Sequence, residues 1–163
     1  MHKTLMAVAA LAVLICLIAI RSAPSAEAEQ VAWFGNRSED GASLIYGTPD
    51  SDHAKIAFNC QAGQDDLVFV YEHKPIEAKD GVKVDVILAA DGIEVTIPTT
   101  GLQLELDDAF LLEGQVKLDA RVRKLLTSQG TLVVTVEDGA DEFPLDGIAT
   151  AAKHVIETCS PNG

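Results

Sequence analysis

Apolar and polar residues alternate through most of the chain, from Val31 to Leu145. Successive side chains of a strand point to opposite faces of a sheet, so a repeat of two is typical of strands that bury one face. The apolar positions are Ile56, Phe58 and Cys60; Leu67, Phe69 and Tyr71; Val82, Val84, Val86 and Leu88; Ile93, Val95 and Ile97; Leu102, Leu104 and Leu106; Leu132, Val134 and Val136; and Phe143 and Leu145, with shorter pieces around Trp33 and Leu44 to Tyr46. Short, closely spaced strands predict a mainly β fold, either an antiparallel sandwich or a partly open barrel.

Two dipeptides predict tight turns between these strands. Asp91-Gly92 separates two alternating runs and supplies the positive φ angles that a two-residue hairpin turn requires. Asp138-Gly139 marks a second turn, which leads into the strand that contains Phe143.

The repeat changes to a helical one in two segments. Asp119 as N-cap and Gly130 as terminator frame a short helix of about ten residues, which we expect on the surface of the sheet. From Asp146 to Cys159 the apolar residues recur at helical spacing. This pattern predicts a C-terminal helix packed on the sheet.

The first 28 residues have the three parts of an export signal. A short basic start is followed by an apolar run from Leu5 to Ile20, and Ala26, Glu27 and Ala28 form a small-residue cleavage site. The alternative is a retained anchor, but the run of 16 residues is shorter than the roughly 20 that span a bilayer. We therefore predict a signal peptide at 1–28, a single β-rich domain at 29–163 and no membrane insertion after cleavage.

Two cysteines, Cys60 and Cys159, remain after removal of the predicted signal, which contains Cys16. Paired cysteines in an exported chain usually form a disulfide. Both positions are on apolar faces, Cys60 on a strand and Cys159 on the last helix, so both sulfurs should point inward. Closing a loop of about 100 residues stabilises a fold by up to roughly 4.7 kcal/mol in the chain-entropy model. The alternative, metal ligation, lacks further Cys or His at ligand spacing.

The chain is acidic, with 12 basic and 25 acidic side chains. Lys3, Arg21 and Glu27 belong to the predicted signal, so the remainder keeps 10 basic and 24 acidic side chains and a net charge of −14. Such a surface repels nucleic acid and anionic lipid and attracts a cationic protein or envelope component. The alternative is that the charge serves solubility alone.

Three histidines follow the predicted signal and are the first candidates for chemistry. His53 follows Asp50 and Asp52 in a loop, where a carboxylate can orient a histidine, but the stretch lacks metal-ligand spacing. His73 is expected at a strand end and His154 on an exposed helix face. Ordinary surface positions explain all three.

Acidic pairs and serines give no clearer site. Asp65-Asp66 and Asp107-Asp108 are adjacent in sequence, so their side chains point to opposite faces of a strand and do not converge. No Gly-x-Ser-x-Gly, phosphate loop, dinucleotide fingerprint or zinc-protease motif is present. The sequence therefore predicts no catalytic, cofactor-binding or metal site.

One basic cluster interrupts the acidic surface. Arg121, Arg123 and Lys124 fall on the first predicted helix, with Lys117 before them. Concentrated positive charge forms a candidate partner-binding site for an anionic group. The alternative is a solvated helix face.

Several stretches resemble known exported proteins. The segments 44–49 (LIYGTP) and 58–60 (FNC), with 143–145 (FPL) and the helix ending in Cys159, resemble small exported proteins of unassigned function in Gram-negative bacteria. This resemblance covers most of the predicted mature chain and implies a periplasmic location. The segment from Phe58 to Tyr71 also resembles the opening of periplasmic lysozyme inhibitors, although their serine-glycine loop has no counterpart here.

These observations predict a periplasmic or secreted, non-catalytic binding or interaction protein. A narrower hypothesis is an inhibitor of a cationic wall-degrading enzyme, suggested by the net negative charge. The alternatives are a hydrolase with a dispersed site, for which His53 is the only hint, and a structural accessory of an envelope complex.

Overall fold

A computed structural model describes residues 30–105 and 108–160. The predicted signal peptide lies outside these residues. The described chain contains strands β1 (Ala32–Arg37), β2 (Gly41–Gly47), β3 (Ala54–Gln61), β4 (Asp66–Glu72), β5 (Lys83–Ala90), β6 (Ile93–Gln103), β7 (Phe110–Lys117), β8 (Thr131–Val136) and β9 (Gly139–Pro144). The helices are α1 (Ala120–Leu125), α2 (Ile148–Ala151) and α3 (Lys153–Thr158). None of these helices has the length and apolar character needed to cross a membrane.

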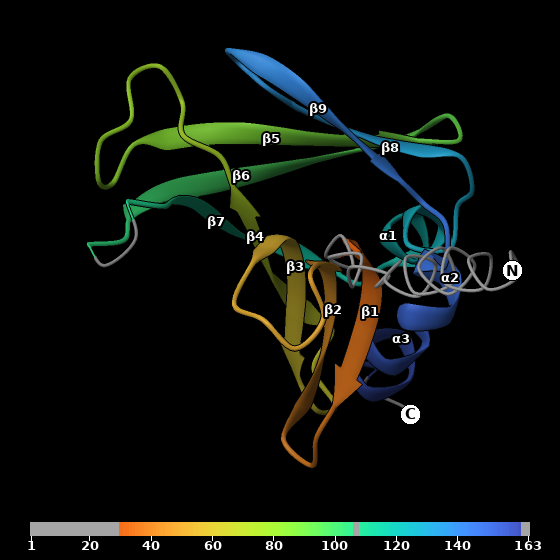
Figure 1. The fold of residues 1–163 in the computed structure, drawn as a ribbon. Coiled ribbons are helices and arrows are strands. Elements are labelled where there is room, and N and C mark those ends of the chain that lie inside the picture. Colours follow the sequence, from red (N-terminus) through yellow and green to blue (C-terminus); the bar gives the residue numbers. More distant parts are fainter. Residues whose placement is uncertain (1–29, 106–107, 161–163) are drawn as a thin grey trace, which may run out of the picture.

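All nine strands belong to one antiparallel sheet, in the order β1-β2-β3-β4-β7-β6-β5-β8-β9. The sheet curls into a half-barrel, with β1 to β3 in one limb and β5, β6, β8 and β9 in the other (Figure 1). The predicted mainly β fold is confirmed, and the architecture is the partly open barrel.

The turns follow the predicted chemistry with one shift. Asp91 and Gly92 form the two-residue turn between β5 and β6, with φ angles of 48° and 70°. In the second hairpin, Val136 pairs with Gly139, so the turn residues are Glu137 and Asp138 and the glycine opens β9. The hairpin is present, but its turn begins one residue earlier than predicted.

The long strand β6 replaces two predicted strands. Its buried positions are Val95, Ile97, Thr99 and Gly101, so the alternation continues without a break. Leu102, which we expected to face the core, lies on the other side of the strand and is 42% exposed. Leu104 follows the strand, and Leu106 lies outside the described residues. Polar Thr99 is accepted in the core because its hydroxyl donates to the Val84 carbonyl at 2.6 Å.

The core fills the inside of the curl. Fully buried side chains come from strands in both limbs and from the helices. The largest are Tyr71, Phe58, Phe69, Phe110, Leu44, Ile56, Leu67, Leu88, Ile97, Leu112, Leu125 and Leu126. The two edge strands also meet, because the Trp33 indole on β1 donates to the Pro144 carbonyl on β9 at 2.7 Å.

The C-terminal helix packs on the sheet as predicted, but it is divided in two. α2 starts at Ile148 after Gly147, and α3 starts at Lys153, with a one-residue interruption at Ala152. The backbone hydrogen bonds from Ala152 to Ile148 and from Ile156 to Ala152 keep the two pieces in line. α3 lies against β1, β2 and β3 (Figure 1).

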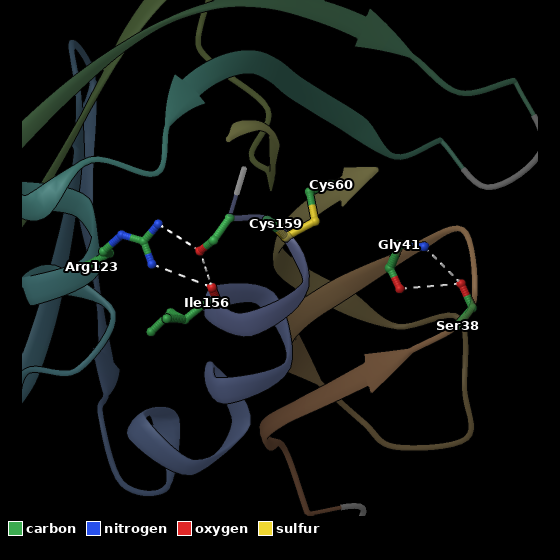
Figure 2. Close-up of a disulfide and its surroundings, with 7 residues drawn as sticks. Ser38, Gly41, Cys60, Arg123, Ile156 and Cys159 are labelled. Carbon is green, nitrogen blue, oxygen red and sulfur yellow. Dashed lines mark hydrogen bonds between the residues drawn. A yellow bond between two sulfur atoms is a disulfide. The ribbon is translucent and has the colours of Figure 1, made fainter. Parts of the chain in front are cut away.

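The predicted disulfide joins Cys60 on β3 to Cys159 at the end of α3, with Cα atoms 5.9 Å apart (Figure 2). Cys159 is fully buried, and Cys60 packs against the core. The bridge closes a loop of 99 residues and therefore fastens the end of the last helix to the sheet.

Candidate functional site

The predicted basic cluster lies on α1. Asp119 caps this helix, since its carboxylate accepts the Val122 N–H at 2.9 Å. Val122 and Leu125 are buried and anchor one side of the helix. Arg121 and Lys124 are exposed and three positions apart, so they lie on the same side of the helix.

An open groove of about 880 Å³ runs beside this exposed side. One wall is Gly92 of the β5–β6 turn with the start of β6, from Ile93 to Thr96, and the end of β7 adds Val116. The opposite wall is α1, including Arg121 and Lys124. The groove therefore brings together a sheet edge and two cationic side chains.

The two groove cations have no acidic partner in the described part of the chain. The Arg121 guanidinium donates to the Glu94 carbonyl at 3.4 Å, a long contact to a neutral acceptor. No carboxylate among residues 30–105 and 108–160 lies within 4.0 Å of Arg121 or Lys124. Arg121 and Lys124 are therefore left without a carboxylate partner, in a groove whose lining also includes Glu94 and Asp119.

Lys117 also lines the groove but is already paired. Its ammonium lies 3.2 Å from Asp65 and 3.7 Å from Asp66. The hydrogen bond with Asp65, followed by the charges of both carboxylates, raises the pKa of Lys117. The expectation that these adjacent aspartates do not converge is therefore wrong, because both carboxylates contact the same lysine. β4 begins at Asp66, so Asp65 lies before the strand and the alternation of strand side chains does not apply to the pair.

Arg123 points away from the groove. Its guanidinium donates to the Leu118 carbonyl at 3.1 Å, to the Ile156 carbonyl at 3.4 Å and to the Ser160 hydroxyl at 2.9 Å. Figure 2 shows the side chain reaching from α1 to the end of α3, near the disulfide. A cation beside the carbonyls of a helix end is favourable. The structure therefore places Arg123 in the join between two helices, apart from Arg121 and Lys124.

The groove exists because β7 leaves β6 part of the way along. The β6–β7 ladder begins at the pair Thr99 and Gly114, and β6 upstream of it pairs only with β5. Pro98 has no N–H to donate, so the ladder cannot continue through it. The close approach at this point also needs a glycine, because a Cβ on Gly114 would stand 2.5 Å from the Pro98 carbonyl oxygen.

A second polar cluster lies at the other end of the curl. The Tyr71 hydroxyl donates to Asp141 Oδ2 at 2.5 Å and lies 3.5 Å from His73 Nδ1. His73 Nε2 is 3.1 Å from Asp138 Oδ1, and Asp138 Oδ2 accepts the Ile76 N–H at 2.6 Å. We call Tyr71, His73, Asp138 and Asp141 the polar clasp. The clasp connects β4 with the β8–β9 hairpin, although β4 is not next to β8 or β9 in the sheet.

The environment of the clasp changes two proton affinities. Burial, and next the hydrogen bond to Asp141, raise the pKa of Tyr71 above its ordinary value of 10.0. The Ile76 N–H, assisted by His73, lowers the pKa of Asp138 below its ordinary value of 3.8. Tyr71 is completely buried, and each clasp group is held by another group of the protein. The geometry is that of a structural contact between two parts of the sheet.

The other candidate residues are dispersed. His53 lies in an exposed loop that also includes Asp50, and its backbone N–H donates to the Ser51 hydroxyl. His154 lies on α3, where its ring approaches Gly35 of β1. Asp108 pairs with Lys74, and Asp107 lies outside the described residues. In the described ranges, no three or more His, Cys, Asp or Glu residues are grouped as a metal site.

Sequence reasoning missed two features of these sites. The free edge of β6 depends on where a neighbouring strand departs, and only Pro98 within an alternating run gave a signal for it. The clasp joins residues 70 positions apart, which no local pattern reveals. No protein-family model, curated protein or solved structure matches the chain.

Proposed function

We propose that this chain is a non-catalytic interaction module outside the cytoplasm, and that it contacts an acidic group of its partner through the groove beside α1. The observation that carries the proposal is the pair Arg121 and Lys124. Both line one groove, both are exposed, and neither has a carboxylate within 4.0 Å among the described residues. In a chain with a net charge of −13, unpaired cations in a groove favour a specific role over general solubility.

The proposed location rests on the disulfide and on the predicted signal. Disulfides persist in oxidising compartments such as the periplasm and are rare in the cytosol. The Cys60–Cys159 bridge supports export, and the resemblance to small Gram-negative exported proteins narrows the proposal to the periplasm.

The proposed lack of catalysis rests on how the histidines are used. A general base needs a nucleophile or substrate position within hydrogen-bond reach. His73 is held by Asp138 within the clasp, whereas His53 and His154 lie on a loop and a helix far apart in the sequence. Residues of catalytic type are therefore distributed over separate structural elements.

Site-specific photocrosslinking in intact cells tests the proposal. A benzophenone amino acid in place of Ala120, which is exposed and lines the groove, leaves Arg121 and Lys124 unchanged. We expect a defined crosslinked partner from this position and none from the same amino acid at exposed Ala140 on β9. The double variant Arg121→Glu/Lys124→Glu should remove the crosslink.

Lys79→Glu/Lys153→Glu is the matched control for this charge change. Both lysines are exposed and have no carboxylate within 4.0 Å in the described chain. A crosslink that survives the groove variant, or disappears equally in the control, would contradict the proposal.

The narrower hypotheses stay predictions. Inhibition of a cationic wall-degrading enzyme would use the acidic remainder of the surface, and full lysozyme activity at excess protein and low salt would exclude lysozyme as its target. A dispersed hydrolase site predicts turnover of ester, peptide or glycan substrates that His53→Ala abolishes. An envelope accessory predicts a defined complex recovered from membranes.

A further inference from the structure

We propose that the groove binds an extended acidic segment of a partner protein, which adds as a further strand to the free edge of β6 and places its carboxylates on Arg121 and Lys124. This inference rests on the proposed function for the use of the groove, and it specifies the shape, chemistry and binding mode of the occupant.

The free edge presents backbone groups in the right direction. A two-residue turn makes Ala90 and Ile93 a hydrogen-bonded pair, so the odd-numbered residues of β6 bond to β5. The N–H and C=O groups of Glu94 and Thr96 therefore point away from β5. The contact from Arg121 to the Glu94 carbonyl confirms this direction.

These groups have no backbone partner in the described chain. β7 pairs with β6 only from Thr99 onward, and no other described segment bonds to the N–H of Glu94 or Thr96. An unpaired row of donors and acceptors is a template for another strand. Glu94 and Thr96 therefore offer three backbone groups without a partner, and the Glu94 carbonyl, which accepts the long contact from Arg121, is the fourth.

The cations match an extended ligand in spacing. Side chains three apart on a helix have Cβ atoms about 5–6 Å apart. Residues two apart on one face of a strand are separated by about 6.8 Å. An acidic-x-acidic pattern in the added strand therefore places one carboxylate near Arg121 and the next near Lys124.

The intervening residues of the ligand are expected to be apolar. An added strand alternates its side chains between two faces, so the residues between the acidic ones point away from the α1 cations. β-branched apolar residues such as valine at these positions favour the extended conformation that strand addition requires. The preferred segment consequently alternates acidic and apolar residues.

A partner protein fits the groove better than a second copy of this chain. Two copies with a net charge of −13 each repel one another as they approach. A partner that is acidic only in the bound segment avoids most of this repulsion.

Binding of a defined peptide tests the proposal. The probe is a fluorescently labelled peptide of four Val-Glu repeats, compared with four Val-Lys repeats, and fluorescence anisotropy at low salt gives the affinity. We expect only the Val-Glu peptide to bind. Arg121→Ala/Lys124→Ala should weaken its binding about tenfold or more, because the ligand carboxylates lose their charged hydrogen-bond donors. Lys79→Ala/Lys153→Ala should leave the affinity unchanged.

The strand-addition step has its own variants. Thr96→Pro removes an N–H that points into the groove and leaves the β5 ladder intact, whereas Thr96→Val keeps that N–H. We expect the first to weaken binding about tenfold and the second to have little effect, as expected when edge hydrogen bonds supply the affinity. A Val-Glu peptide N-methylated on alternate residues makes the same test on the unmodified protein, so a folding defect in Thr96→Pro does not decide the outcome.

The outcomes separate this inference from the proposed function. Strand addition would be overturned if the peptides N-methylated at the odd or at the even positions bound as tightly as the unmodified peptide. A crosslink that depends on Arg121 would in that case still support the groove as the partner site. A dimer of the chain that Thr96→Pro dissolves would overturn the assignment to a partner protein. If the unmodified protein gave no crosslink from position 120 and bound no Val-Glu peptide, both proposals would be overturned.

Discussion

The polar clasp and the groove beside α1 both contain polar and charged groups, but these groups are used in opposite ways. In the clasp, Tyr71, Asp141 and Asp138 are held by hydrogen bonds from within the protein. In the groove, no carboxylate of the described residues pairs with Arg121 or Lys124. The start of β6, before Thr99, has no neighbouring strand on that side among the described residues. Polar groups already bonded within the fold contribute to stability, whereas unpaired ones remain available for a ligand. Substitutions in the clasp should therefore change stability, and those in the groove should change binding.

The largest expected effect comes from the framework that both regions share. Replacing Cys60 and Cys159 by serine should lower the free energy of unfolding by about 3–5 kcal/mol, because the unfolded chain regains the entropy of a long loop. Urea denaturation of the variant and of the oxidised parent measures this difference. Mass analysis of the protein isolated from cells without reductant should find no free thiol at either position. Two free thiols there would remove the shared framework.

The clasp itself is tested by Tyr71→Phe. The variant keeps the buried ring but removes the hydroxyl that donates to Asp141, so the free energy of unfolding should fall by about 1.5–3 kcal/mol. Tyr46→Phe is the matched control, because no described hydrogen bond involves its hydroxyl and its ring contacts with Trp33 and Phe143 remain. Equal effects of the two substitutions in chemical denaturation would contradict a stabilising clasp. Peptide binding in the groove should not change in either variant.

Two arginines on one helix sharpen the comparison. Arg123→Ala removes three hydrogen bonds, one to Leu118 before α1, one to Ile156 of α3 and one to Ser160 after α3, and should cost about 1–2 kcal/mol of stability. Arg121→Ala removes one long contact from an exposed side chain and should stay within about 0.5 kcal/mol of the parent. Thermal and urea unfolding of the two variants provide the measurement. If Arg121→Ala were the more destabilising of the two, the division between structural and available cations would be wrong.

The same comparison explains what the sequence revealed. Alternation identified the strands, and Asp91-Gly92 identified their hairpin, because these signals depend on adjacent residues. The disulfide was predictable because only two cysteines follow the predicted signal and both lie on apolar faces. The separation of Arg123 from Arg121 depends on where α3 packs, and the clasp depends on how far the sheet curls. Such long-range packing produces no periodic pattern in the sequence.

Local alternation also misplaced Leu102. Its neighbours Leu104 and Leu106 continued a plausible run, but Thr99 and Gly101 keep the inward register of β6. A glycine and a hydrogen-bonded threonine occupy positions where an apolar pattern expects larger side chains. The groove was only half predictable for a related reason, since the sequence marked its cations but not the strand edge beside them.

The smallest expected effect is a pH dependence confined to the clasp. The Ile76 N–H, together with His73, favours the ionised form of Asp138, so its pKa is lower in the folded chain than in the unfolded one. This contribution is present above the ordinary value of 3.8 and is lost as the pH falls through the lower folded pKa, because protonation then weakens both contacts. The stability of Asp138→Asn should therefore decline less steeply below pH 3.8 than that of the parent, as measured by urea denaturation across this range. Asp146→Asn, which alters an exposed carboxylate outside the clasp, should follow the parent curve. If stability fell equally with pH in Asp138→Asn and in the parent, this carboxylate would be no better stabilised in the folded chain than in the unfolded one. Asp138 would then not contribute to stability in the way that separates the clasp from the groove.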